Sequence, residues 1–233
     1  MKMYKKVMAA ALAGVMTVSM SATAFAADDD GYILKATNED SKSSDNDLVI
    51  AIEGSVSSMD PANIPDTNAI SATRGVYETL VSFDENQELT GKLAESWEVS
   101  DDSLTYTFKL RQGVKFQDGT DFNAAAVKAN YDRVVNKDNN LRQRRTFIVT
   151  NEDGSETPRV DSIETPDDYT LVIKLTQAWA PFINRLTQFC IISPAALEEY
   201  GNDIMNHPCG TGPYVCTEWE EVGCSHVVLR KTM

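Results

Sequence analysis

The feature that most constrains the fold is a run of alternating apolar and polar side chains over residues 104–110. Apolar residues take every second position, and Thr or Lys takes the positions between them. A period of two, with aromatic side chains on the apolar face, is typical of a half-buried antiparallel strand. Turn-forming residues lie on either side, at 101–103 and at Asp118-Gly119. The centre of the chain is therefore predicted to be rich in β-structure.

Other segments carry the patterns of helices and of further strands. Helices are predicted over residues 68–80, 123–135, 181–189 and 194–201, with Asn123 and Ser193 as caps of the second and fourth. Strands are predicted over residues 48–52, 160–163, 171–175, 214–219 and 227–229. This mixture predicts an α/β protein.

Residues 1–26 have the pattern of a secretory signal peptide. Three lysines near the start precede a short apolar run, and Ala24-Phe25-Ala26 forms an A-x-A cleavage site. A transmembrane helix is the alternative, but the apolar run is short for spanning a bilayer. Residues 27–46 carry many acidic and few apolar side chains, which is typical of a solvated acidic linker. We therefore expect an exported protein, periplasmic and soluble once the signal is removed.

The charge balance of the chain argues against a polyanionic partner. Lys and Arg number 21 against 35 Asp and Glu, for a formal net charge of -14. Removal of residues 1–26 would take away three Lys and no acid, so the processed chain would be more acidic still. Because phosphate contacts need a surplus of basic side chains, nucleic acid is not an expected partner.

The four cysteines all lie late in the chain, between residues 190 and 224. In an exported chain an even number of cysteines permits two disulfides, and Cys216 and Cys224 could face each other across a hairpin. The alternative is four unpaired thiols that pack as small apolar groups. His207 and His226 lie in the same region, but the spacings match no usual zinc arrangement, so no metal site is expected.

The sequence contains no recognisable catalytic motif. Gly210-Thr211-Gly212 lacks the Lys and the following helix of a phosphate-binding loop. Neither a G-x-S-x-G nucleophile elbow nor an H-E-x-x-H zinc motif occurs, and two late histidines give little material for a Ser-His-Asp triad. The acidic pairs at 101–102 and 167–168 fall in predicted turns, where solvated side chains are usual. We therefore expect a protein that is not an enzyme and holds no cofactor.

Five stretches of sequence, in their order along the chain, carry a resemblance to a known family. They are SMDPA at 58–62, the long block at 76–134, APFINRL at 180–186, IISPAALEEYG at 191–201 and HPCGTGPYVCTEW at 207–219. In this order they closely resemble the extracellular solute-binding proteins of ABC importers, in the family of periplasmic oligopeptide- and dipeptide-binding proteins. The block at 93–133 is the most specific, and residues 139–147 look most like the dipeptide and glutathione branch.

The resemblance implies an α/β, periplasmic-binding-protein-like lobe that captures peptides for an ABC permease in the inner membrane. It covers only the N-terminal part of the family's length, from about Leu48 to about Trp219. We therefore expect residues 47–233 to form an incomplete first lobe, with a β-rich subdomain at about 82–178 and the second lobe absent. A truncated binding component is the first interpretation. The alternatives are a stand-alone lobe acting as a protein-interaction module and, more remotely, a hydrolase.

The resemblance also implies two groups of ligand-binding residues. At the end of the first strand, backbone groups could bind an extended peptide as an added strand does, with an ordinary strand exit as the alternative. After the helix at 123–135, an arginine fork would suit a ligand carboxylate, with a solvated basic loop as the alternative. The candidate residues are Glu53, Gly54, Ser55, Val56, Arg144, Arg145 and Phe147.

Overall fold

The computed structural model describes residues 47–48, 56–64, 67–222 and 224–231. The chain divides into two compact units, Met1–Lys42 and Ser43–Met233, and every described element belongs to the second. The predicted signal peptide, the acidic linker and most of the predicted first strand lie outside the described residues. Only β1 (Asp47–Leu48) is described in that strand region. Within the described part, no helix has the length and apolar character needed to cross a membrane.

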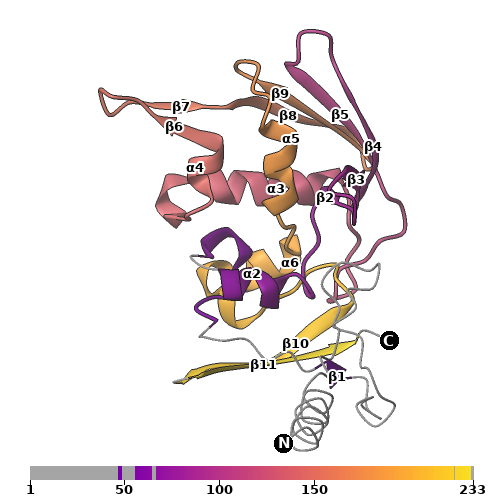
Figure 1. Ribbon diagram of the computed structural model, residues 1–233, viewed down its shortest axis with the longest axis vertical. Helices are drawn as coiled ribbons and strands as arrows, with labels where there is room; N and C mark the ends of the chain where they lie inside the picture. The colour runs from indigo at the N-terminus through magenta and orange to yellow at the C-terminus, as the bar shows by residue number, and fades with distance from the viewer. Residues whose placement is uncertain (1–46, 49–55, 65–66, 223, 232–233) are drawn as a thin grey trace, which may run out of the picture. The chain divides into compact units, whose positions relative to one another are not determined.

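The main sheet is built around the strand that the alternating pattern predicts. Strand β5 (Thr105–Leu110) lies between β4 (Ala94–Val99) and β9 (Thr170–Leu175), and β8 (Val160–Asp167) pairs with β9. All pairings are antiparallel, in the order β4-β5-β9-β8 (Figure 1). The strands predicted over 160–163 and 171–175 are confirmed as β8 and β9, which form a hairpin with its turn at residues 168–169.

One set of side chains along β5 enters the larger hydrophobic core. Tyr106, Phe108 and Leu110 are buried, whereas Lys109 between them is exposed. Full burial of a large apolar side chain contributes about 1.5–3 kcal/mol relative to exposure. The alternation in the sequence therefore corresponds to a real difference between the buried and the solvent-facing sides of the strand.

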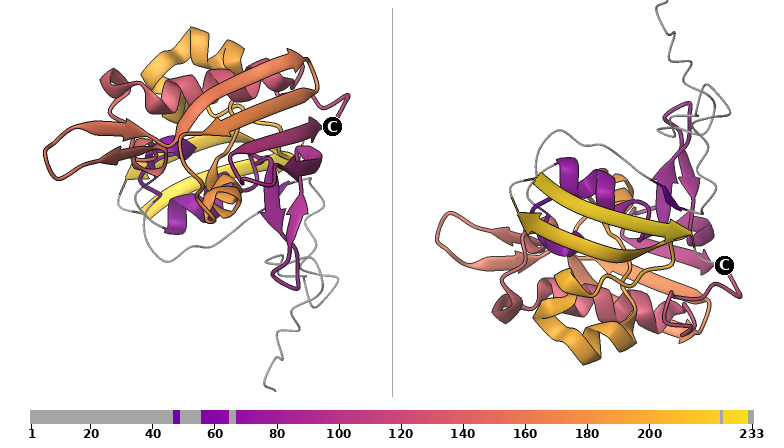
Figure 2. Two further views of the ribbon diagram at one scale, coloured as in Figure 1. Left: turned by 90° about the horizontal axis from the view of Figure 1, so that it is seen from above. Right: turned by 90° about the horizontal axis from the view of Figure 1, so that it is seen from below.

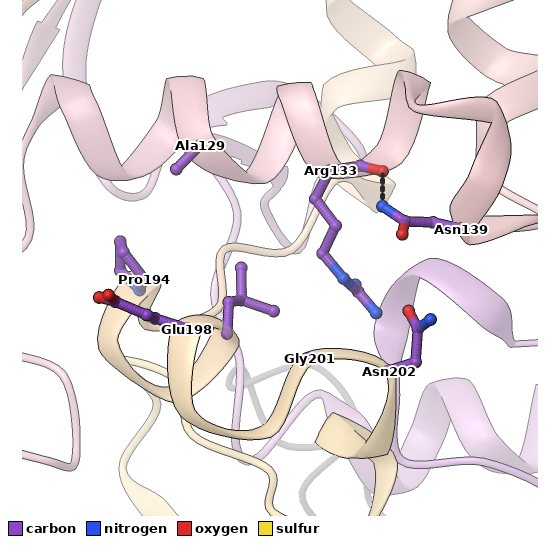
Figure 3. Close-up of a pocket in the computed structure, with 8 residues that line it drawn as sticks. Ala129, Arg133, Asn139, Pro194, Glu198, Gly201 and Asn202 are labelled. Atoms are coloured by element: carbon purple, nitrogen blue, oxygen red, sulfur yellow. Dashed lines mark hydrogen bonds between the residues drawn. The ribbon is translucent and has the colours of Figure 1, made fainter.

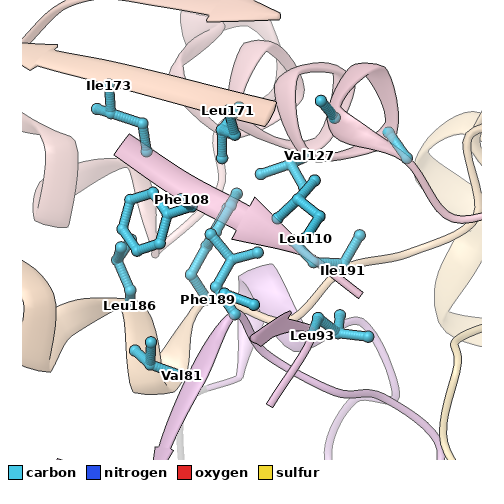
Figure 4. Close-up of a cluster of buried hydrophobic side chains, with 14 of the residues drawn as sticks. Val81, Leu93, Phe108, Leu110, Val127, Leu171, Ile173, Leu186, Phe189 and Ile191 are labelled. Atoms are coloured by element: carbon cyan, nitrogen blue, oxygen red, sulfur yellow. The ribbon is translucent and has the colours of Figure 1, made fainter. Parts of the chain in front are cut away.

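Helix α3 (Ala124–Val135) covers this core and confirms the predicted cap. The side chain of Asn123 accepts a hydrogen bond from the amide of Ala126 at 2.9 Å. Val127 is buried among the side chains of β5 and β9, as Figure 4 shows beside Leu110 and Leu171. The helix thus buries one face against the sheet, as its spacing of apolar residues requires.

Several short elements connect the larger ones. They are η2 (Pro61–Asn63), β2 (Val81–Phe83), β3 (Leu89–Gly91), η3 (Lys137–Asn139), α4 (Arg144–Phe147), β6 (Ile148–Thr150), β7 (Glu156–Pro158), α5 (Phe182–Arg185) and η4 (Leu186–Gln188). The helix predicted over 181–189 is therefore two short pieces, α5 and η4. Figure 2 shows the β6–β7 hairpin projecting beyond the neighbouring elements.

A second hydrophobic cluster is assembled from segments far apart in the sequence. Helices α2 (Thr67–Thr73) and α6 (Pro194–Tyr200), together with η5 (Gly201–Asn206), contribute buried side chains to it. The hairpin of β10 (Tyr214–Val222) and β11 (Cys224–Lys231) adds Leu229, and β1 pairs with β11. Both strands predicted near 214–219 and 227–229 are confirmed and are longer than expected. The predicted cap of α6 by Ser193 is also confirmed.

The predicted helix over residues 68–80 is wrong in its second half, because α2 ends at Thr73. Beyond that point the amides of Arg74 and Tyr77 still donate to carbonyls of the preceding turn, but the backbone carbonyls accept from other segments. The carbonyl of Val76, for example, accepts the amide of Gly212 at 2.9 Å. Long-range backbone pairing therefore replaces helix where the apolar pattern alone would have allowed it.

The turn at residues 210–213 is built for close packing, not for phosphate binding. A side chain on Gly212 would place its Cβ 2.4 Å from the carbonyl oxygen of Gly75. The side-chain nitrogen Nε2 of Gln117 supports the same turn by donating to the carbonyls of Gly212 and Tyr214, at 3.1 and 2.6 Å. The glycine lets two backbones meet, and Gln117 connects them to the turn that precedes α3.

Candidate ligand-binding site

The predicted strand-end residues are only partly described. Glu53, Gly54 and Ser55 lie outside the described residues. Val56 is 2% exposed, and its carbonyl accepts a hydrogen bond from the indole nitrogen of Trp219 at 3.3 Å. The side chain of Val56 thus belongs to the second cluster, and its carbonyl oxygen is engaged inside the chain.

Asp60 lies just beyond this strand end and is held by a buried ion pair. Its two carboxylate oxygens accept from Nη1 and Nη2 of Arg133 at 3.2 and 2.7 Å. The Asp60 and Arg133 side chains are only 6% and 10% exposed. Asp60 also caps η2, because Oδ1 accepts the amide of Ala62 at 3.0 Å. Sequence reasoning missed this pair, since no spacing relates an aspartate in a loop to an arginine on a distant helix.

Arg144 presents its guanidinium to a neighbour in the chain. Its Nη1 and Nη2 donate to the two carboxylate oxygens of Glu156 at 2.7 and 2.8 Å, and Nε donates to the carbonyl of Val135 at 2.9 Å. The hydrogen bonds between the two side chains raise the pKa of Arg144 and lower the pKa of Glu156. The fork expected to receive a ligand carboxylate is therefore occupied by Glu156.

Arg145 is the predicted arginine that remains available. It is exposed and, within the part of the chain that the structure describes, makes no hydrogen bond or ion pair. Together with Lys137, Arg142 and the Arg144–Glu156 pair, it lines a depression of about 310 Å³. Four cations against one carboxylate make this depression basic on an otherwise acidic chain, which suits a ligand that carries a carboxylate.

Phe147 lies in the core and not on the wall of this depression. Its side chain is 1% exposed, and its ring meets Tyr131 and Phe189 edge to face, with ring centroids 5.3 Å apart in both pairs. Desolvation of the Tyr131 hydroxyl, together with the negative charge of Asp132, raises the pKa of Tyr131 to about 12. The structure therefore separates Phe147 from Arg145, although the two are close in the sequence.

A second hollow of about 280 Å³ lies between α3 and α6. Figure 3 shows Ala129 and Arg133 on one side, and Pro194, Glu198 and Asn202 on the other. The guanidinium of Arg133 reaches toward Asn202, while Asn139 donates to the carbonyl of Arg133 at 2.8 Å. The hollow therefore adjoins the buried ion pair that holds Asp60.

The predicted facing pair of cysteines is wrong. Cys216 lies opposite Leu229 in the β10–β11 register, and Cys224 lies opposite Val222 next to the turn. Cys216 is a free thiol, as are Cys190 and Cys209. The backbone positions of Cys216 and Cys224 lie several residues apart along the hairpin, so the structure does not bring the two cysteines opposite each other.

Metal binding finds no support in the described residues. Within those ranges, no group of three or more His, Cys, Asp or Glu side chains is arranged to hold a metal ion. Burial keeps the thiols protonated: it raises the pKa of Cys190 to about 12 and that of Cys209 and Cys216 to about 11. Thiolates are the metal ligands and nucleophiles, so these thiols are poorly suited to either role.

Solved structures place the fold in the class of periplasmic binding proteins. NikZ from Campylobacter jejuni, solved with Ni(L-His), superposes with a TM-score of 0.65 and 28% identity over 76% of this chain and 34% of its own. The periplasmic binding protein DppA from Helicobacter pylori, solved with the peptide STSA, has a TM-score of 0.60 and 29% identity over 77% and 38%. Coverage of about a third of each neighbour is consistent with a single lobe of that fold.

The sequence comparison then narrows the class to one family. The model for bacterial extracellular solute-binding proteins, family 5 (middle region), matches residues 88–232, and this chain therefore belongs to that family. The glutathione-binding protein GsiB of Shigella dysenteriae serotype 1 is 39% identical over 210 residues, which are 89% of this chain and 36% of that protein. The chain thus spans about a third of the length of the curated relatives it matches. The predicted resemblance is confirmed.

Proposed function

We propose that this chain contributes a ligand-binding surface of an ABC importer's solute-binding protein, and that its ligands are short peptides, including glutathione. The observation that carries the proposal is the basic depression around Arg145. The relative of this chain in Shigella dysenteriae serotype 1 is named a glutathione-binding protein. The similar structure from Helicobacter pylori was solved with the peptide STSA. Peptides and glutathione carry carboxylates, and an arginine with no partner among the described residues is a suitable donor to such a group.

Within this proposal the two arginines have different tasks. Arg145, together with Arg142, faces solvent and is available to a ligand carboxylate. Arg144 stabilises the wall of the depression by donating to the carboxylate of Glu156 and to the carbonyl of Val135. The strand-end residues Glu53, Gly54 and Ser55 stay proposed ligand contacts, as the resemblance implies.

The remaining parts of the proposal concern the cell. The chain acts by binding and release, not by catalysis, and it delivers its ligand to an ABC permease of the inner membrane. It is exported by the segment at residues 1–26 and acts in the periplasm. The family membership supports this role, and the acidic composition is compatible with a soluble exported binder.

The test is a titration of the purified chain lacking residues 1–26, followed by NMR so that even millimolar binding is detected. Glutathione and a tetrapeptide with a free carboxylate are added, and the same peptide with an amidated C-terminus is the control ligand. We expect saturable shifts centred on Arg142 and Arg145 for the first two ligands and weaker binding of the amide.

Two variants sharpen the titration. Arg145→Ala is expected to weaken binding by roughly tenfold or more, because a hydrogen bond to a charged group contributes about 1.5–3 kcal/mol. Arg185→Ala is the matched control, since Arg185 is likewise exposed and does not line the depression. Equal affinity of Arg145→Ala and the unaltered chain, or equal binding of the acid and amide peptides, would contradict the proposal.

A further inference from the structure

The buried pair of Asp60 and Arg133 joins two segments that lie far apart in the sequence. Arg133 is in the last turn of α3, and Asp60 follows the predicted strand end. Both Nη atoms of Arg133 are directed at the carboxylate of Asp60, so the contact fixes a direction as well as a distance. Water is largely excluded from both side chains, so loss of either partner leaves a buried charge uncompensated and is more damaging than at the surface.

The same turn of α3 also anchors the arginine-bearing segment. The carbonyl of Val135, two residues after Arg133, accepts Nε of Arg144 at 2.9 Å. The carbonyl of Arg133 itself accepts the side-chain amide of Asn139 at 2.8 Å, which ties down the loop between α3 and α4. One turn of helix therefore holds the base of the basic depression.

A direct backbone contact closes the arrangement. The amide of Gln143 donates to the carbonyl of Ala62 at 3.0 Å, and the amide of Ala62 donates to Asp60. The segment 58–62 and the segment 142–145 are thus each bound to the end of α3 and also to each other. Three independent contacts define one geometry, so neither segment can shift without breaking at least one of them.

We propose that Asp60 and Arg133 are positioning residues that hold the loop after the first strand and the arginine-bearing segment at α4 in a fixed mutual arrangement. Neither residue touches the ligand in this proposal; they act through Ala62, Gln143 and Arg144. The inference deepens the proposed function, because it rests on Arg145 being a ligand contact, but the junction itself can be tested without a ligand.

The structural arm of the test is amide hydrogen exchange, followed residue by residue by NMR in the chain lacking residues 1–26. Asp60→Asn and Arg133→Met remove the ion pair. We expect protection of the Ala62 and Gln143 amides to fall by about tenfold or more, while the Leu110 amide of the main sheet changes by less than about twofold.

Two further variants keep the result interpretable if the first ones fold poorly. Arg133→Lys keeps the charge but loses the two-pronged donor, so it is expected to restore part of the protection lost in Arg133→Met. The matched control is Lys128→Met, which breaks the exposed Lys128–Asp132 pair on the same helix, where the side chains are 43% and 55% exposed. It is expected to change none of these amides.

The outcomes separate the junction from the proposed function. Loss of protection confined to Ala62 and Gln143, with partial rescue by Lys, supports the junction, and weaker shifts of Arg145 in the ligand titration then support its positioning role. Unchanged protection in Arg133→Met, or equal loss throughout the main sheet, overturns the proposal. Local loss with undiminished ligand affinity overturns the positioning role. A chain that binds no ligand, yet loses protection locally, supports the junction and contradicts the proposed function.

Discussion

The two hydrophobic clusters of this molecule are constructed in different ways. The larger one is centred on β5, whose alternating side chains already indicate which face is buried. The second draws on Val56, Ala69, Ile192 and Leu229, which come from both ends of the described chain. The first cluster is therefore specified largely by a local pattern, and the second by how distant backbones fit together.

This difference predicts different weaknesses. In the larger cluster, the burial of large side chains supplies most of the stabilising free energy. Shortening one of these side chains should therefore be the most damaging change. Beside the second cluster, the backbone of residues 75–76 approaches Gly210 and Gly212 too closely for a Cβ atom at either glycine, so an added atom there should be the most damaging change. Four measurements test this contrast, from the largest expected effect to the smallest.

Removal of the Phe108 ring should have the largest effect. Phe108 is fully buried at the centre of the main sheet (Figure 4), so Phe108→Ala is expected to lower the free energy of unfolding by about 3–5 kcal/mol. Urea denaturation followed by circular dichroism measures the change. Phe83→Ala is the control, because Phe83 is 46% exposed and should lose far less. Equal losses in the two variants would argue against a core centred on β5.

An added methyl group at Gly212 should have the next largest effect. Because its Cβ would lie 2.4 Å from a backbone oxygen, Gly212→Ala is expected to cost about 2–3 kcal/mol of unfolding free energy. Urea denaturation followed by tryptophan fluorescence, to which Trp219 beside the second cluster contributes, reports the transition. Gly154 has open space where a Cβ would lie, and its only constraint is a positive φ. Gly154→Ala should therefore lower the free energy of unfolding by only about 1 kcal/mol. A Gly212→Ala cost no larger than that would contradict the close-packing argument.

The thiols of the second cluster should react slowly in the folded chain. Burial raises the pKa of Cys209 and Cys216 to about 11, against roughly 8.5 for a free thiol, so few thiolates form at pH 8. Labelling with a disulfide reagent should be slow at pH 8, faster toward pH 11, and fast at either pH in urea. Because the folded state keeps protons that the unfolded state releases, stability should decrease as pH rises between these values. Rapid labelling of the folded chain at pH 8 would argue against burial.

The Arg144–Glu156 pair should give the smallest effect, because it joins α4 to an exposed strand of the β6–β7 hairpin. Hydrogen bonding to Arg144 lowers the pKa of Glu156, so the pair stabilises β6–β7 above the ordinary glutamate pKa and is lost as pH falls through the lowered value. NMR of the hairpin amides should show a transition in this acidic range that Glu156→Gln abolishes. Glu152→Gln, in the same hairpin, should leave it unchanged, and a transition that survives Glu156→Gln would implicate another group.

The elements that the sequence predicted well are those whose signals are local. Strand β5 follows from period-two alternation, and α3 and α6 begin after Asn123 and Ser193, whose side chains satisfy the first free amides. The helix predicted over 68–80 failed because its second half finds backbone partners more than a hundred residues away, such as Gly212. No local window contains that information.

The candidate site shows the same contrast between local sequence signals and long-range contacts. The resemblance located the arginine-bearing segment, but only the packing distinguishes Arg144, bound to Glu156, from Arg145, which faces solvent. Phe147 could not be assigned to the core from its neighbours in sequence, because its partners Tyr131 and Phe189 come from other elements. The register that separates Cys216 from Cys224 likewise depends on where the β10–β11 turn falls.

By itself, the sequence determined the family, the acidic character and the secondary structure that follows from short-range periodicity and capping. These properties depend on residue type and on spacings of a few positions, which the chain carries whether or not it is folded. The tertiary structure alone decided the Asp60–Arg133 pair, the close approach at Gly212 and which predicted arginine has no partner in the described part of the chain. Each of these depends on which distant groups meet, and that is settled only when the hydrophobic clusters have closed.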